Sequence, residues 1–111
     1  MSARMIMIKE KLTGIRNKLS EINDREHTTS SLLLRLGKVI NILVVNEQKI
    51  WLRTKVGDPM LRELQESVEA ASAILESGNY NLNGFEASFK DIESRAAKID
   101  EESRRRSMVV T

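Results

Sequence analysis

The sequence predicts an all-α protein, an antiparallel bundle of four helices with heptad, coiled-coil-like packing. Apolar residues recur in alternating steps of three and four from Met5 to Ile50, which places them on one side of a helix. Segments rich in glycine, asparagine or proline interrupt the chain at 57–59 and at 78–84. Because the heptad spacing resumes after each interruption, we expect two further helices beyond the first long apolar series.

The first helix is expected over residues 3–26. The following segment, 27–31, contains only residues of mediocre helix propensity, and its hydroxyl groups can cap a new helix. However, the heptad phase runs through this segment, with the polar residues Glu26 and Thr29 at core positions. The same phase continues to the predicted core positions Leu33, Leu36, Ile40, Leu43 and Glu47. The alternative fold is therefore one long N-terminal helix over 3–55, about 75 Å in length, followed by a C-terminal helical hairpin.

The second helix, expected over 31–55, is apolar on more faces than a surface helix needs. Two explanations are open: this helix contacts every other helix of its own chain, or a second copy covers the extra apolar surface. We favour a homo-oligomer, a dimer or a tetramer. Its predicted interface consists of Leu32, Leu36, Val39, Ile42, Leu43, Val45 and Trp51.

The third and fourth helices are expected over 59–77 and 84–105. Gly57 is expected to end the preceding helix in the left-handed conformation, with Asp58 as the next cap and Pro59 in the first turn. Together the four helices form one domain, 1–106, and residues 107–111 are predicted to be a disordered tail.

Charge is unevenly distributed along the chain. Eleven basic and five acidic residues lie before residue 57, and seven basic and eleven acidic residues follow. Antiparallel pairing of the first helix with the last would bring Lys9 toward Asp100 and Arg16 toward Glu93. Such exposed pairs contribute only ~0.2–1 kcal/mol each, so they choose between helix partners more than they hold the fold together. The predicted pairing charges are Lys9, Arg16, Lys18, Glu86, Glu93 and Asp100.

Catalytic and metal chemistry finds little support in the composition. The chain has no cysteine and a single histidine, His27, so neither a thiolate site nor an oriented histidine relay is expected. No catalytic residue, metal site or cofactor is predicted. The N-terminal residues include Arg4 and Lys9, which does not fit a signal peptide, and the apolar stretch 32–45 is interrupted by charge. We expect an intracellular, cytoplasmic protein without a transmembrane segment.

The predicted function is non-enzymatic assembly through protein–protein contacts, as a scaffold, adaptor, chaperone or complex subunit. Its expected partners are a second copy of the chain and another protein. The alternative is a nucleic-acid-binding accessory protein, which would contact phosphates through the basic first helix and through Arg104, Arg105 and Arg106. An acidic helix packed alongside would neutralise these cations, and no aromatic platform for stacking bases accompanies them.

Overall fold

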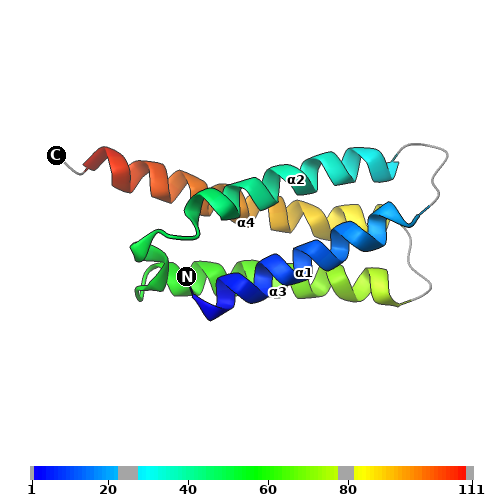
Figure 1. Cartoon of the computed structure of the whole chain (residues 1–111), viewed down its shortest axis with the longest axis horizontal. Helices are drawn as coiled ribbons and strands as arrows, with labels where there is room; N and C mark the ends of the chain where they lie inside the picture. Colours follow the sequence, from blue (N-terminus) through cyan, green and yellow to red (C-terminus); the bar gives the residue numbers. More distant parts are fainter. Residues whose placement is uncertain (1, 23–27, 78–81, 110–111) are drawn as a thin grey trace.

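The computed structural model describes residues 2–22, 28–77 and 82–109 of the chain. Within them lie four α-helices, α1 (Ala3–Ser20), α2 (Thr28–Asn46), α3 (Gly57–Glu76) and α4 (Leu82–Val109), and a 3-10 helix, η1 (Ile50–Arg53) (Figure 1). The described residues contain no strand, which confirms the all-α bundle. Because α1 ends at Ser20 and α2 begins at Thr28, the single long helix is not adopted.

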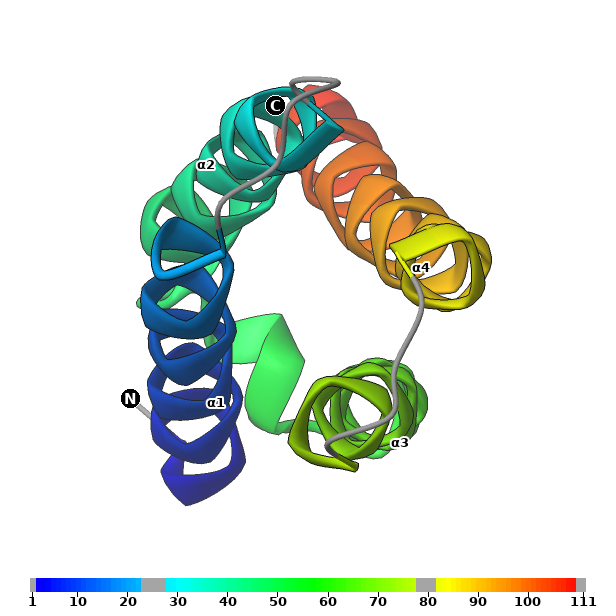
Figure 2. The same cartoon turned by 90° about the vertical axis from the view of Figure 1, so that its right-hand side faces the viewer.

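The helices alternate in direction along the chain, but successive helices are not always neighbours. Among the described residues, α1 packs beside α2 and α3, and α4 packs beside α2 and α3, whereas no Cα atoms of α1 and α4, or of α2 and α3, lie within 8 Å of each other. Figure 2 shows these last two pairs at opposite corners of the bundle. The adjacent pairs α1 with α3 and α2 with α4 therefore run parallel, and the chain crosses the bundle end between α2 and α3.

This crossover explains why α2 ends at Asn46 rather than near residue 55 as predicted. Residues 47–55 contain no glycine or proline, so nothing in the local sequence indicates a break. Leu52, only 2% exposed, lies in the hydrophobic core, and η1 contacts α3. A straight continuation of α2 would carry Leu52 away from that core, so tertiary packing overrides local helix propensity here.

Gly57 has a different role from the one predicted. It is the first residue of α3, and its backbone is not in the left-handed region. A Cβ atom at this position would lie 2.3 Å from the Trp51 carbonyl oxygen and 2.5 Å from the Leu52 Cα. Glycine is therefore required by the close approach of η1, not by a helix C-cap. The hydroxyl of Thr54 accepts hydrogen bonds from the Val56 and Gly57 amides, which provides a partner for the first backbone N–H group of α3.

The core is built from one buried stripe on each helix. In α1 the buried residues are those predicted from the sequence, Met5, Ile8, Leu12, Ile15 and Leu19. In α2 the stripe is displaced: Leu32 and Val39 are buried, whereas Leu33 and Ile40, predicted to be core positions, are only half-buried. Since α1 and α2 are separate helices, the second need not keep the phase of the first.

Two further predictions concern segments near the ends of helices. α4 continues to Val109, so part of the tail predicted to be disordered is helical, while residues 110–111 lie outside the described residues. His27 and the rest of the segment 23–27 also lie outside the described residues, as does most of the predicted linker 78–84.

Candidate interaction surface

The side of α2 that faces away from the core carries several apolar residues. Leu34 is 67% exposed, Val45 60% and Val44 46%, and they lie on the opposite side of the helix from the buried stripe. Four further exposed positions complete this side, and Lys38 is its only charged residue. We call the set the α2 outer face: Ser31, Leu34, Gly37, Lys38, Asn41, Val44 and Val45.

Gly37 forms a notch in the α2 outer face. It lies in the middle of a helix, where glycine is less favourable than alanine by roughly 0.5–1 kcal/mol. A Cβ added at this position would meet no atom within 4 Å, and the backbone does not have a positive φ. No contact within the described part of the chain therefore requires glycine at residue 37.

Most residues of the predicted oligomer interface instead belong to the core. Leu32, Leu36, Val39 and Leu43 are at most 3% exposed and pack inside the bundle, so they are unavailable to a second copy. The prediction was wrong for these four because it followed the apolar breadth of the helix without knowing which stripe faced inward. Val45 is well exposed, and Ile42 is half-buried at the edge of the α2 outer face.

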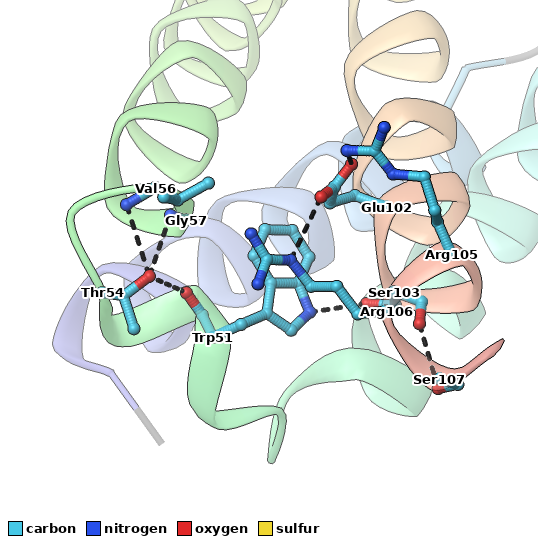
Figure 3. Close-up of polar contacts among 9 residues, drawn as sticks. All are labelled: Trp51, Thr54, Val56, Gly57, Glu102, Ser103, Arg105, Arg106 and Ser107. Carbon is cyan, nitrogen blue, oxygen red and sulfur yellow. Dashed lines mark hydrogen bonds and ion pairs between the residues drawn. The ribbon is translucent and has the colours of Figure 1, made fainter. Parts of the chain in front are cut away.

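Trp51, also predicted at the interface, is half-buried and fastens the crossover to α4 (Figure 3). Its indole Nε1 donates a hydrogen bond to the Ser103 hydroxyl at 2.9 Å, and the Arg106 guanidinium lies 5.0 Å from its ring centroid. The Arg106 Nε in turn donates to Glu102 at 3.1 Å. These contacts hold η1 against α4 at one end of the bundle. Trp51 therefore makes its contacts within its own chain.

The arginine cluster of α4 is paired with acidic residues of the same helix. The Nη2 of Arg104 lies 2.7 Å from the Oδ2 of Asp100, and Arg105 and Arg106 both form ion pairs with Glu102. The hydrogen bond from Arg105 is the main reason that the pKa of Glu102 lies below its usual value. Each guanidinium thus has a nearby carboxylate, although such exposed pairs can open at little cost.

The predicted pairing of α1 charges with α4 charges does not occur, because these helices lie at opposite corners. The partner of Glu93 and Glu86 is Arg35 of α2, whose Nε and Nη1 atoms donate at 3.0 and 3.2 Å. These carboxylates, Glu93 foremost, raise the pKa of Arg35, which also lies 5.4 Å from the Phe89 ring centroid. Lys9 instead pairs with Glu47, the residue that follows the end of α2.

The other residues of the predicted pairing also do not join the first helix to the last. They are Arg16, Lys18 and Asp100. Arg16 and Lys18 are exposed, and Lys18 borders a shallow groove between α1 and α3. Asp100 accepts a hydrogen bond at 3.2 Å from the Nδ2 of Asn46, which also donates to the Ile42 carbonyl. Asn46 is 1% exposed, and its Oδ1 has no hydrogen-bond partner among the described residues. Its burial was missed because the predicted heptad phase placed Glu47, not Asn46, in the core.

The described residues hold no cluster of three or more histidine, cysteine, aspartate or glutamate side chains suited to a metal ion. One helical segment, Thr29–Asn46, is long and apolar enough to cross a membrane by length and composition alone, and 33% of it is buried in the bundle. Soluble core helices can meet the same criterion, and here Arg35 of that segment is engaged by two carboxylates of α4.

Comparison of the chain with models of protein families, with curated proteins and with solved structures finds no match.

Proposed function

We propose that this protein is a non-enzymatic helical assembly protein that associates with copies of itself through the α2 outer face. The observation that carries the proposal is the exposure of Leu34 and Val45 on a helix whose other side already fills the core. Removing apolar surface from water contributes about 25 cal/mol per Å², so contact with a second copy would stabilise these side chains. A helix with apolar residues on both sides is typical of a buried helix.

The outward side of α3 provides a contrast within the same molecule. Its exposed residues include Arg62, Glu66, Glu69 and two alanines, so it is a charged surface suited to water. The α2 outer face has one charged residue among seven positions. Because charged residues are depleted at the centres of protein interfaces, this composition favours α2 over α3 as the site of association.

Nucleic-acid binding has weaker support as the function. It would use the basic residues of α1, of which Arg16 and Lys18 are exposed, together with Arg104, Arg105 and Arg106, whose guanidinium groups already have carboxylate neighbours on α4. The ring of Trp51, which lies against Arg106, is hydrogen-bonded to Ser103 through its Nε1 rather than presented for base stacking.

Solution mass tests the proposal directly. Sedimentation of the unmodified protein over a range of concentrations is expected to show a species larger than the monomer. Leu34→Glu combined with Val45→Glu should shift the protein to monomer without loss of helical circular dichroism, since both side chains are exposed. The matched control places two glutamates on α3, Ala70→Glu with Ala73→Glu, and should keep the larger mass. A monomeric unmodified protein at every concentration would refute self-association.

A further inference from the structure

We infer that the α2 outer face pairs with the same face of a second copy in antiparallel orientation, with Val45 of each copy filling the notch at Gly37 of the other. The inference rests on the proposed self-association and specifies its geometry. The resulting dimer has two-fold symmetry, the commonest symmetry of soluble oligomers.

The receiving side is a hole between four residues of α2. In helix packing of the knobs-into-holes kind, four residues spaced as i, i+3, i+4 and i+7 surround a hole that accepts one side chain. Leu34, Gly37, Lys38 and Asn41 have this spacing and are all exposed. Because Gly37 has no side chain and open space above its Cα, the hole is deeper on that side.

The inserting side chain is Val45, which is 60% exposed. Val45 lies one turn after Asn41, and Gly37 lies one turn before it. In an antiparallel pair with its two-fold axis near Asn41, Val45 of one copy therefore lies over the hole of the other. The symmetry forms the same contact a second time, with the two copies exchanged. A branched side chain of this size can approach a glycine backbone closely. The close approach would offset the unfavourable placement of Gly37 in a helix interior.

Asn41 is the residue at the two-fold axis. Its amide has both donors and an acceptor, so two symmetry-related copies can donate to one another. A single polar asparagine within a helical interface fixes register and oligomer number in coiled coils at a cost in stability. Asn41 would fix the register of the pair in the same way.

Lys38 favours the antiparallel orientation over the parallel one. In a parallel pair with the same symmetry, Lys38 would face Lys38 and Gly37 would face Gly37, which places like charges together and leaves the notch empty. In the antiparallel pair the two lysines lie on opposite sides of the axis. The methylene groups of Lys38 can then cover Val44 of the second copy while the ammonium group stays in water.

Filling the notch tests the inference with a control from the same chain. Gly37→Leu should weaken dimerisation at least about tenfold while leaving the monomer folded, because the notch is empty within the bundle and overpacking a tight contact is unfavourable. Gly14→Leu is the matched control, since Gly14 is also exposed, helical and free of atoms within 4 Å of its Cβ position. It should leave the dimerisation constant unchanged.

Cross-linking tests the orientation, and the natural chain has no cysteine to interfere. Asn41→Cys should form a covalent dimer with a short bismaleimide. Ser31→Cys, exposed on the same helix, should not, because in the antiparallel pair its two copies lie roughly 30 Å apart along the helices. Covalent dimers of Ser31→Cys would indicate a parallel pair and overturn the inference.

The two proposals fail in different ways. An unmodified protein that is monomeric removes self-association and this geometry together. If the unmodified protein associates and Leu34→Glu with Val45→Glu separates it, but Gly37→Leu has no effect or Asn41→Cys does not cross-link, the α2 outer face remains the interface. The Gly37 contact is then wrong.

Discussion

At the scale of single residues, glycine has two different roles in this protein. Gly57 is packed so closely against the backbone of η1 that no side chain fits, whereas Gly14 and Gly37 have open space above them. The sequence alone does not show whether a glycine is packed against another backbone or has open space above it. A glycine beside an aspartate and a proline indicates a helix boundary in both situations. The start of the third helix, predicted at residue 59, lies two residues earlier at Gly57, and the reason for the glycine was not predicted.

Substitution of Gly57 by alanine should therefore be far more damaging than its size suggests. The added methyl group would overlap backbone atoms of Trp51 and Leu52, which cannot move aside as a flexible side chain can. We expect Gly57→Ala to lower the free energy of unfolding by at least about 2 kcal/mol, measured by urea denaturation. Gly14→Ala is the control and should raise it by ~0.5–1 kcal/mol, and equal effects of the two substitutions would contradict the close approach.

At the scale of elements, the helices that were predicted best are those whose boundaries are marked by residue type. The start of α3 is marked by proline, and the predicted end of its range, residue 77, agrees with the last helical residue, Glu76, to within one position. No residue type in the sequence indicates the end of α2, since its position depends on which residues Leu52 and Trp51 pack against. Those partners lie on other helices, some fifty residues away in the case of Ser103, and local sequence carries no information about them.

The hydrogen bond between Trp51 and Ser103 is expected to stabilise the crossover measurably. Trp51→Phe keeps an aromatic ring but removes the Nε1 donor, and should lower the free energy of unfolding by about 1 kcal/mol. Ser103→Ala removes the acceptor and should have a similar effect. Because both changes break one contact, the double variant should lose less than the sum of the two, as measured by urea unfolding followed by far-ultraviolet circular dichroism. Additive losses would mean that the bond contributes nothing.

At the scale of the whole molecule, the sequence predicted four helices with inward apolar stripes but not which helices are neighbours. Several arrangements of the same four helices would bury each apolar stripe at the bundle centre. The charges that were used to choose among them lie at the surface, where each pair contributes little. The diagonal crossover between α2 and α3 then places α4 beside α2, so the carboxylates of α4 meet Arg35 instead of the lysines and arginines of α1.

A double-mutant cycle distinguishes these two arrangements of the helices. Glu93→Arg should lower the free energy of unfolding because it places a cation against Arg35, whose side chain is only 24% exposed. Arg35→Glu in the same chain should restore part of the loss, with a coupling energy of about 1 kcal/mol, because it recreates an opposite-charge pair. Arg16→Glu, the partner expected from the sequence, should restore nothing, since α1 and α4 lie at opposite corners of the bundle with no Cα atoms within 8 Å of each other. Rescue by Arg16→Glu but not by Arg35→Glu would instead place α1 beside α4.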